Sequence, residues 1–258
     1  MLGGLYATIY DWFGYSIPIK QRYELIKKAG FDGILMWWSS YLERGDYRKG
    51  SEYARETSLF IENIHTPFQV QDDIWSDNLA GEASIDCYMQ CVSDCSEFDI
   101  PTMVIHLPDD DKPHNLLGLN RIKRLAEKAE MHGVNISFEN LNNYENLTYI
   151  LDNIDSKRVG FCYDVCHHLR YYPQIDLPLI YGSRMTALHL HDYDGISIHK
   201  LPFDGITDWQ PIMDKLAQIN YNGDIAIEAM NWSYTELTAI DFLYRAYDST
   251  IRLAGLIL

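Results

Sequence analysis

The segment RVGFCYDVCHHLR, residues 158–170, has the character of a buried strand in its first half. Val159–Tyr163 is apolar, aromatic or glycine, and the run then ends at Asp164, with His167 and His168 shortly after it. A carboxylate that is buried without a partner at the end of a core strand is strongly destabilising. The segment therefore predicts a strand whose C-terminal end carries Asp164 together with a partner for that carboxylate.

The same pattern extends over the rest of the chain, where short apolar runs alternate with amphipathic stretches. We expect strands at Tyr6–Tyr10, Gly33–Trp38, Phe60–His65, Thr102–His106, Val134–Glu139, Val159–Asp164, Met185–His191 and Asp224–Glu228. We expect helices at Ile19–Ala29, Asp46–Leu59, Ala83–Phe98, Leu116–His132, Tyr144–Ile154, Trp209–Ile219 and Tyr234–Leu253. Strands that alternate with helices indicate a parallel sheet. Eight such units in about 250 residues are typical of a (β/α)8 TIM barrel, so we predict an α/β fold with one such domain over residues 1–258.

Residues at the ends of these elements agree with this interpretation. Gly30 follows the first predicted helix, where glycine adopts a left-handed cap at no steric cost. The predicted helix at Leu116–His132 ends at Gly133. We expect Asp208 to cap the helix that begins at Trp209. An open doubly wound sheet is the alternative, and it usually has a glycine-rich phosphate turn after its first strand. Here that turn reads DWFGYSIP, which favours the barrel.

The charge balance of the chain bears on its partners. The 21 Lys and Arg residues and 37 Asp and Glu residues give a formal net charge of −16. Such a surface repels phosphate backbones unless a basic patch overrides it, and the most basic stretch, Arg121–Lys128, is interspersed with apolar residues. These observations weigh against nucleic acid as a partner. No stretch approaches the apolar length needed to span a membrane.

Five cysteines, an odd number without a framework spacing, suit a reducing compartment. Cys87, Cys91 and Cys95 share one helix face, and we favour small buried thiols over a metal site there. We expect Cys162 and Cys166 to be packing residues too. The first residues lack a basic segment followed by an apolar run, so we expect no signal peptide and predict a cytoplasmic protein.

Six of the apolar runs end in a side chain that can bind a metal ion. These residues are His65, His106, Glu139, Asp164, His189 and Glu228. In a TIM barrel the C-terminal strand ends converge on the face that carries the active site. A lone strand-end His or Glu is more often structural, but three carboxylates gathered on one face would repel each other and take up protons. A divalent cation removes that repulsion, so the set predicts a metal site.

The ligand types constrain the metal. One set contains three oxygen ligands and one nitrogen ligand, namely Glu139, Asp164, His189 and Glu228. This set suits Mn²⁺, Mg²⁺ or Co²⁺, with Zn²⁺ as a further alternative. His65 and His106 would add a nitrogen-rich second site, for which Zn²⁺ is the natural ion.

The order His, His, Glu, Asp-x-x-His, His, Glu along eight strand–helix units resembles the xylose isomerase-like barrel superfamily. That superfamily includes sugar isomerases and epimerases and the metal-dependent apurinic/apyrimidinic endonucleases. The resemblance spans essentially the whole chain, and its most specific parts are YDVCHH, LHLHD and the tail GITDW…YNGDIAIE.

The isomerase and epimerase branch implies one divalent metal on Glu139, Asp164, His189 and Glu228. Glu139 and Glu228 would also be the acid–base pair, and His167 would contact a substrate hydroxyl. The metal polarises a carbonyl and the adjacent hydroxyl, which makes the neighbouring C–H acidic. One glutamate then removes a proton to give a metal-stabilised enediolate, and the other returns one.

The endonuclease branch implies three zinc ions. The first would be bound by His65, His106 and Glu139, and the second by the four-residue set above. The third needs His167 and a later Asp-x-His, and here Ser197, Ile198 and His199 stand at that place without the aspartate. Asp192 or Asp194 is the candidate substitute.

Two further positions depart from the epimerase pattern or extend it. The epimerase branch often has an arginine a few residues after the strand-seven histidine, but the segment HDYDGISIHK has none. Many members also carry a glutamate at the end of the second strand, where this chain has Met36, Trp37 and Trp38. These tryptophans are either core packing or an aromatic wall for a sugar face. His191 points the same way as His189 from a strand, as a further ligand or as a residue that orients one.

We therefore predict a divalent-metal-dependent sugar or polyol isomerase or epimerase of carbohydrate metabolism, with His167, His199 and Trp37 as substrate-binding candidates. A keto-polyol dehydratase could use the same site. A zinc-dependent phosphodiester hydrolase of the apurinic/apyrimidinic endonuclease type is the alternative from another class. A non-catalytic sugar-binding protein is a third reading, against which the presence of both Glu139 and Glu228 argues. The sequence leaves open the sugar, the metal and the oligomeric state, although related barrels often assemble.

Overall fold

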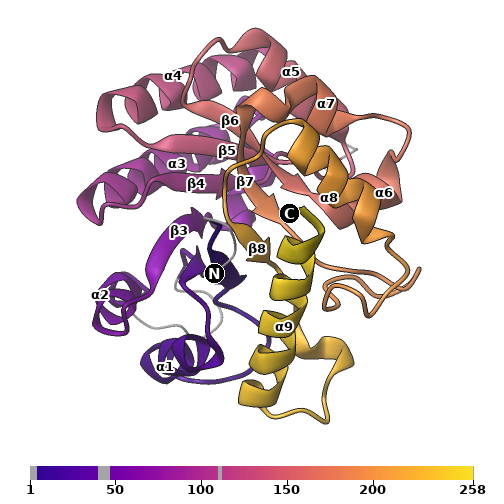
Figure 1. Cartoon of the computed structure of the whole chain (residues 1–258). Helices are drawn as coiled ribbons and strands as arrows, with labels where there is room; N and C mark the ends of the chain where they lie inside the picture. The colour runs from indigo at the N-terminus through magenta and orange to yellow at the C-terminus, as the bar shows by residue number, and fades with distance from the viewer. Residues whose placement is uncertain (1–4, 40–46, 110–111, 258) are drawn as a thin grey trace. The chain divides into compact units, whose positions relative to one another are not determined.

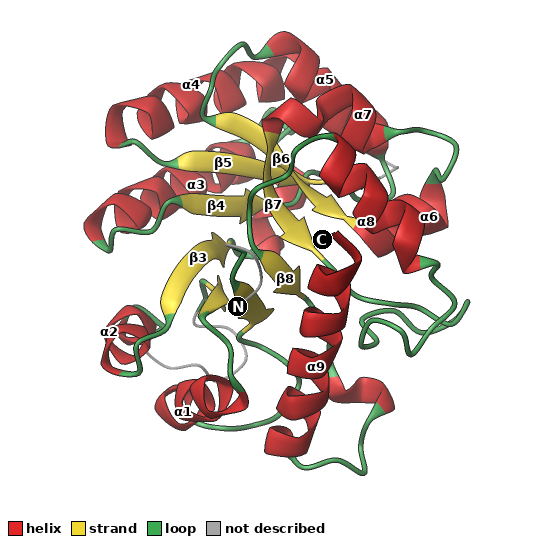
Figure 2. Ribbon diagram, viewed as in Figure 1, coloured by secondary structure: helices red, strands yellow, loops and turns green. Residues whose placement is uncertain are grey.

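The computed structural model of the chain describes residues 5–39, 47–109 and 112–257. Helices and strands alternate along it, as the colour gradient of Figure 1 and the red and yellow elements of Figure 2 show. The strands are β1 (Ala7–Tyr10), β2 (Gly33–Trp37), β3 (Phe60–His65), β4 (Thr102–Ile105), β5 (Asn135–Glu139), β6 (Val159–Asp164), β7 (Met185–His189) and β8 (Ile225–Ile227).

The helices follow these strands. The α-helices are α1 (Ile19–Ala29), α2 (Lys49–Glu56), α3 (Leu79–Glu97), α4 (Leu116–His132), α5 (Tyr144–Asn153), α6 (Val165–Tyr171), α7 (Leu177–Tyr181), α8 (Trp209–Gln218) and α9 (Ala239–Ile257). The described residues also form the short 3-10 helices η1 (Phe68–Asp73), η2 (Gly182–Arg184) and η3 (Asn231–Ser233).

The eight strands have the order β7-β6-β5-β4-β3-β2-β1-β8. Leu190, directly after β7, forms a parallel bridge to Ile227 of β8. The chain also divides into two compact units, which are described separately below. The first unit comprises Met1–Glu62, Leu177–Gly182 and Leu188–Leu258, and the second comprises Asn63–Asp176 and Ser183–Ala187.

In the first unit β1 pairs in parallel with β2 on one side and with β8 on the other. A buried cluster forms where these strands meet: Tyr10, Leu35, Trp37, Ala226 and Met230. Helix α9 packs against both α1 and α8. Helix α1 ends at Ala29 and is capped by Gly30, whose φ of 114° is the left-handed conformation that glycine adopts without strain.

In the second unit β3, β4, β5 and β6 pair in parallel. Val104, Cys162 and Ala187 form a buried cluster there, and α3 packs against α4. Asn78 and Asn115 begin these two helices, and each accepts a hydrogen bond from the backbone N–H of the glycine three residues on. Among the described residues, no helix combines the length and the apolar character that a membrane crossing requires.

Several predicted elements have the observed bounds, and others need correction. Strands β3 and β6 and helices α1 and α4 begin and end where the sequence predicts. Helix α3 starts at Leu79 rather than Ala83, because Asn78 caps it. Helix α9 starts at Ala239 rather than Tyr234, because the chain first forms η3. The predicted start of the second helix, Asp46, lies outside the described residues.

Helices α6 and α7 were not predicted, since each is too short to show a periodic apolar face. The predicted capping role of Asp208 is wrong in one respect: it precedes α8 in an extended conformation, but its side chain makes no capping hydrogen bond. Within α3, Cys91 and Cys95 are buried. Burial raises the pKa of the Cys95 thiol, so it remains a neutral packing group.

Candidate metal centre

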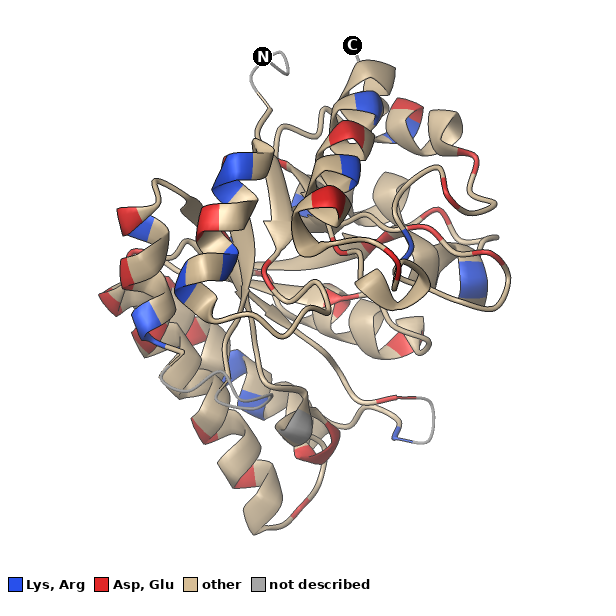
Figure 3. Ribbon diagram, turned by 90° about the horizontal axis from the view of Figure 1, so that it is seen from below, with Lys and Arg blue, Asp and Glu red and all other residues tan. Residues whose placement is uncertain are grey.

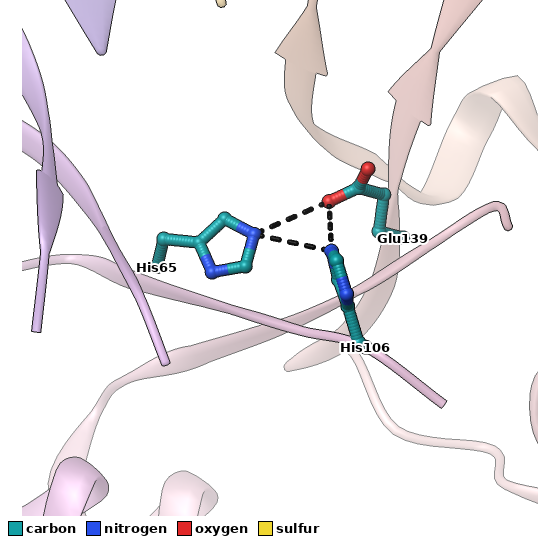
Figure 4. A group of neighbouring side chains, drawn as sticks. All are labelled: His65, His106 and Glu139. Carbon is teal, nitrogen blue, oxygen red and sulfur yellow. Dashed lines mark hydrogen bonds and ion pairs between the residues drawn. The ribbon is translucent and has the colours of Figure 1, made fainter. Parts of the chain in front are cut away.

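Three predicted ligands of the second unit converge on one another (Figure 4). His65 ends β3, Glu139 ends β5, and His106 is the first residue after β4. Nε2 of His65 lies 3.2 Å from Nε2 of His106 and 3.5 Å from Oε2 of Glu139. Nε2 of His106 lies 3.0 Å from the same carboxylate oxygen. Two ring nitrogens and one carboxylate oxygen thus point at a common centre.

The backbone fixes the tautomer of His65. Its Nδ1 lies 3.1 Å from the carbonyl oxygen of Thr66, which can only accept, so the hydrogen of the neutral ring is on Nδ1. Thr66 is itself held by Val104, whose carbonyl oxygen accepts from both its N–H and its hydroxyl. Nε2 of His65 therefore presents its lone pair toward His106 and Glu139, as the imidazole of a metal ligand does.

These separations agree with a tetrahedral metal site. Zinc–nitrogen and zinc–oxygen bonds of about 2.0–2.1 Å at tetrahedral angles place ligand atoms about 3.3 Å apart. The three observed separations of 3.0, 3.2 and 3.5 Å bracket this value. His65 and Glu139 are only 1% and 2% exposed, so a buried carboxylate here requires a cationic or hydrogen-bonding partner. The group fits a zinc-like ion.

Asp164 and His167 extend this group within the second unit. Oδ1 of Asp164 accepts a hydrogen bond of 2.7 Å from the backbone N–H of His167, which makes the aspartate the N-cap of α6. This hydrogen bond holds His167 next to the C-terminal end of β6. Nδ1 of His167 lies 3.2 Å from Oε1 of Glu139 and 3.6 Å from Oδ2 of Asp164. Two buried carboxylates therefore face one imidazole nitrogen.

The adjacent His168 has a structural role. Its Nδ1 and the hydroxyl of Tyr163 are 2.6 Å apart, and its Nε2 lies 2.6 Å from the carbonyl oxygen of Ile175. Burial lowers the pKa of His168, which favours a neutral ring that donates from Nε2 and accepts at Nδ1. Both nitrogens are thus occupied, and only the first histidine of the sequence pair belongs to the candidate site.

In the first unit Glu228, which directly follows β8, contacts two imidazoles. Nδ1 of His189 lies 3.2 Å from Oε2 of Glu228, and Nδ1 of His199 lies 4.0 Å from the same oxygen. Nδ1 of His199 is also 3.0 Å from the carbonyl oxygen of Glu228, which places its hydrogen on Nδ1. Glu228 is 6% exposed and His189 is 1% exposed.

His191 orients His199. Their rings stack with centroids 4.2 Å apart, and Nδ1 of His191 accepts a hydrogen bond of 3.0 Å from the backbone N–H of His199. This bond uses the Nδ1 lone pair, so the neutral His191 ring carries its hydrogen on Nε2. His199 has a φ of 56°, a left-handed conformation that is uncommon for a side chain of this size. The role of orienting residue fits His191 better than that of ligand.

The two aspartates considered for a third zinc site are engaged by their own loop. Both oxygens of Asp192 accept hydrogen bonds, and the donors are the backbone N–H groups of Tyr193, Phe203 and Thr207 and the indole N–H of Trp209. Asp194 accepts from the backbone N–H groups of Ser197 and Ile196 and from Lys200, which lower its pKa to about 2. Both carboxylates therefore have structural partners in their own loop, and their role at a third zinc site stays a prediction.

The aromatic residues differ from the sequence-based expectation. Trp37 is 1% exposed and lies in the buried cluster of the first unit, as core packing requires. Trp232, which sequence reasoning missed, is 60% exposed and meets the ring of His199 edge to face, with centroids 5.5 Å apart. Its position four residues after Glu228 was the available signal.

The sequence-predicted residues therefore fall into two groups. The second unit brings together His65, His106, Glu139, Asp164 and His167. The first unit brings together His189, His199 and Glu228. The four-residue ligand set predicted from the sequence draws on both units, and it stays a prediction.

Several curated proteins are similar in sequence. Inosose dehydratase of Lactiplantibacillus plantarum is 24% identical over 239 residues, which cover 82% of this chain and 73% of that protein. Probable endonuclease 4 of Mycoplasma capricolum is 27% identical over 115 residues, or 40% of each chain. An uncharacterised protein of Methanocaldococcus jannaschii is 25% identical over 187 residues. That match covers 65% of this chain and 64% of the relative, so somewhat less than two thirds of the relative's length is represented.

Solved structures share the fold at low sequence identity. A D-tagatose 3-epimerase-like protein has a TM-score of 0.77 at 19% identity, with 98% of this chain and 97% of that chain covered. D-psicose 3-epimerase of Clostridium cellulolyticum, solved with D-tagatose, has a TM-score of 0.80 at 17% identity and covers 98% and 99%. The IolI protein, solved with a bound zinc atom, has a TM-score of 0.79 at 16% identity and the same coverage.

A family model settles the classification. The model described as xylose isomerase-like TIM barrel matches residues 23–246. These residues include every strand from β2 to β8 and all the candidate ligands. The chain belongs to the xylose isomerase-like TIM barrel family and has the (β/α)8 fold that its sequence predicts.

Proposed function

We propose that this protein is a divalent-metal-dependent isomerase or epimerase of a sugar or polyol, with Glu139 and Glu228 as its acid–base pair. The observation that carries the proposal is that each unit holds one buried strand-end glutamate against imidazole nitrogens. A protein that only bound a sugar would not need two such groups. Several of the relatives described above have enzyme names, namely inosose dehydratase, probable endonuclease 4 and D-psicose 3-epimerase, which supports a catalytic role.

The metal would be held by the four residues of the predicted set: Glu139, Asp164, His189 and Glu228. A bound Mn²⁺, Mg²⁺, Co²⁺ or Zn²⁺ would polarise a substrate carbonyl and its neighbouring hydroxyl and so acidify the adjacent C–H. Hard and borderline ions suit three oxygen ligands and one nitrogen ligand. The zinc in the IolI structure supports a metal in this fold, although it does not identify the ion here.

The protein's own groups carry the proton transfers. One glutamate removes a proton from the carbon next to the carbonyl, and the other returns a proton. Return to the opposite face of the same carbon epimerises the substrate, and return to the neighbouring carbon isomerises it. Nδ1 of His167 faces the carboxylates of Glu139 and Asp164, so this nitrogen carries the hydrogen. Nε2 then serves as the acceptor for a substrate hydroxyl.

The length of the sequence match to inosose dehydratase supports the proposed substrate class. The match to inosose dehydratase covers 82% of this chain, whereas that to probable endonuclease 4 covers 40%. Inosose is a keto-polyol, which has the carbonyl and adjacent hydroxyl that the proposed chemistry needs. Dehydration of a keto-polyol starts with the same proton removal, so a lyase is the near alternative. Loss of one water from the product, measured by mass spectrometry, distinguishes the lyase from an isomerase.

One observation favours a second candidate function, hydrolysis of a phosphodiester. The His65–His106–Glu139 group has the separations of a zinc site, and two-metal hydrolases clamp phosphate oxygens in this way. Against it, the net charge is −16, and Lys and Arg positions lie among Asp and Glu positions along the helices (Figure 3). The carboxylates of Asp192 and Asp194 also accept hydrogen bonds from their own loop, which does not favour a third zinc site.

The experiment that tests the proposal uses the metal-reconstituted protein in D₂O with a panel of ketopentoses, ketohexoses and inososes. We expect deuterium to replace the proton at one carbon of a substrate. Proton NMR detects this exchange as the loss of that proton's signal. Glu139→Gln and Glu228→Gln should abolish this exchange. Glu145→Gln, at an exposed position of α5, is the matched control and should exchange normally. Incision of duplex DNA at an abasic site, without exchange in any sugar, would instead support the hydrolase.

A further inference from the structure

The side chain of Asn140 bonds to both backbone polar groups of Asp164. Its Oδ1 accepts a hydrogen bond of 2.7 Å from the backbone N–H of Asp164, and its Nδ2 donates one of 2.8 Å to the carbonyl oxygen of the same residue. Both residues are completely buried. The carboxamide thus satisfies two backbone groups that water cannot reach, and that would otherwise be left unpaired at considerable cost.

These two side-chain hydrogen bonds continue the link between β5 and β6 where their backbone pairing ends. Glu139 lies opposite Cys162 in the parallel register of β5 and β6. The next backbone contact, from the N–H of Asn140 to the carbonyl oxygen of Cys162, is stretched to 3.4 Å. Beyond it the chain of β6 turns into α6. The Asn140 carboxamide spans the gap that opens there and ties the end of β5 to the first turn of the helix.

Two carboxylates depend on this tie. Glu139 directly precedes Asn140 in the sequence, and Asp164 is the residue whose backbone the Asn140 carboxamide binds. Oε1 of Glu139 and Oδ2 of Asp164 face the same Nδ1 of His167 at 3.2 and 3.6 Å. Two buried carboxylates without an intervening cation repel each other, so a fixed backbone is needed to keep them facing one centre.

We infer that Asn140 is a positioning residue that sets the separation of the Glu139 and Asp164 carboxylates and thereby the affinity of the site for a divalent metal. The inference rests on the proposed metal site but not on the proposed reaction. Partners that hold ligands in place typically change metal affinity by about 10–100-fold when they are removed. Sequence reasoning missed this residue, because a polar residue after a strand-end glutamate has no distinctive pattern.

Asn146 provides a matched control in the same unit. It is also completely buried, its Oδ1 accepts from the backbone N–H of His114, and its Nδ2 donates to the carbonyl oxygen of Pro108. Within the described part of the chain, its side chain bonds to His114, Pro108 and Lys112 and to none of the candidate ligands. Replacing either asparagine with serine removes a carboxamide that bonds backbone groups in both directions, so the two variants should lose similar stability.

The test is titration of the metal-free protein with Co²⁺ alone, followed by its visible absorption spectrum, with melting temperature measured in parallel. Asn140→Ser should weaken Co²⁺ binding at least about tenfold and alter the spectrum, whereas Asn146→Ser should bind Co²⁺ as the wild type does. Asn140→Asp keeps the acceptor for the Asp164 N–H, and it is measured in the same way in case the serine variant does not fold.

The outcomes separate this inference from the proposed function. Equal Co²⁺ affinity and spectrum for the Asn140 variants and Asn146→Ser would overturn the role of Asn140, whatever the enzyme's activity. A wild-type protein that binds no Co²⁺ would overturn the metal site itself. Absence of sugar chemistry in a protein whose Asn140 variants lose Co²⁺ selectively would contradict only the proposed reaction.

Discussion

Nε2 of His106 lies 3.0 Å from Oε2 of Glu139, so the carboxylate proposed as an acid–base group also belongs to a His–His–Glu cluster. Nε2 of His65 completes that cluster at 3.2 Å from His106. The same glutamate therefore has one oxygen toward this cluster and the other toward His167. Glu139 belongs to a single metal site if the protein binds one ion, and it is shared between two sites if the cluster binds a second ion. Variants of the residues next to it distinguish these two alternatives.

Replacement of His106 by alanine tests whether the cluster holds its own metal. If the cluster binds an ion of its own, His106→Ala should lower the zinc content by one ion per chain, because one of three converging ligands is lost. If the protein binds only the metal of the four-residue set, as proposed above, the zinc content should not change. Proton exchange in a sugar should remain within about tenfold of wild type, since His106 is outside the four-residue set. Metal analysis by mass spectrometry and the exchange assay measure the two effects. His132→Ala, at an exposed position at the end of α4, is the control. Loss of all exchange in His106→Ala would show that the cluster is essential to catalysis.

Removal of metal should destabilise the fold. The buried carboxylates repel each other without a cation, and a metal present at 100 times its dissociation constant adds about 2.7 kcal/mol to the free energy of unfolding. For a chain of this size that corresponds to a fall of about 5–10 °C in melting temperature on chelation. Calorimetry with and without chelator measures it. An unchanged melting temperature would argue against a metal bound to the native state.

Trp232 should contribute to substrate binding. It is 60% exposed beside His199, and an exposed indole face can stack on the C–H face of a sugar. Trp232→Ala should raise KM by about 2–10-fold with little change in kcat, in line with aromatic contacts of about 0.5–1.5 kcal/mol. Trp232→Phe should restore much of the affinity. Tyr244→Ala, at an exposed aromatic position of α9, is the control. An unchanged KM in Trp232→Ala would exclude the contact.

Glu62 should make stability fall as the pH rises. Burial first, and then the nearby Asp224, raise its pKa from 4.5 to about 8, against the opposing hydrogen bond from the Thr8 hydroxyl. Between these two values the folded state holds a proton that the unfolded state has released. The free energy of unfolding therefore decreases as the pH rises through this window, by an amount on the order of 5 kcal/mol.

Glu62→Gln removes that titration. Urea unfolding at pH 5, 6, 7 and 8 should show a flatter profile than wild type and a gain in stability at pH 8. Glu24→Gln, at an exposed position of α1, should leave the profile unchanged. A wild-type profile that rises between pH 5 and 8, or a Glu62→Gln profile that matches it, would contradict the assignment.

The sequence predicted the elements whose signals are local. The bounds of α1 and α4 were predictable, because an amphipathic stretch ends at a glycine that takes up the left-handed conformation. Strand β6 was predictable because apolar residues run up to Asp164. Helix α6, with only seven residues, depends on the Asp164 cap and on the His168–Tyr163 contact. Such contacts form only in the folded chain.

The candidate site was predictable in its ligands but not in its supporting contacts. Strand ends identified His65, His106 and Glu139, because the side chains of successive parallel strand ends lie on one face. The tie from Asn140 to Asp164 could not be predicted, since it joins residues 24 positions apart. Whether Trp37 or Trp232 is exposed also depends on packing between strands and loops, and composition gives no signal for it.

The measurement that tests the central claim most directly is incorporation of solvent deuterium into a carbon of a ketose or inosose, for wild type and Glu228→Gln with metal present. The proposal predicts incorporation by the wild-type protein, dependence on the divalent metal, and loss of the exchange in Glu228→Gln. Incorporation that persists in Glu228→Gln would remove this residue from the acid–base pair. No incorporation in any ketose or inosose, combined with metal-dependent cleavage of a phosphodiester, would contradict the proposed function.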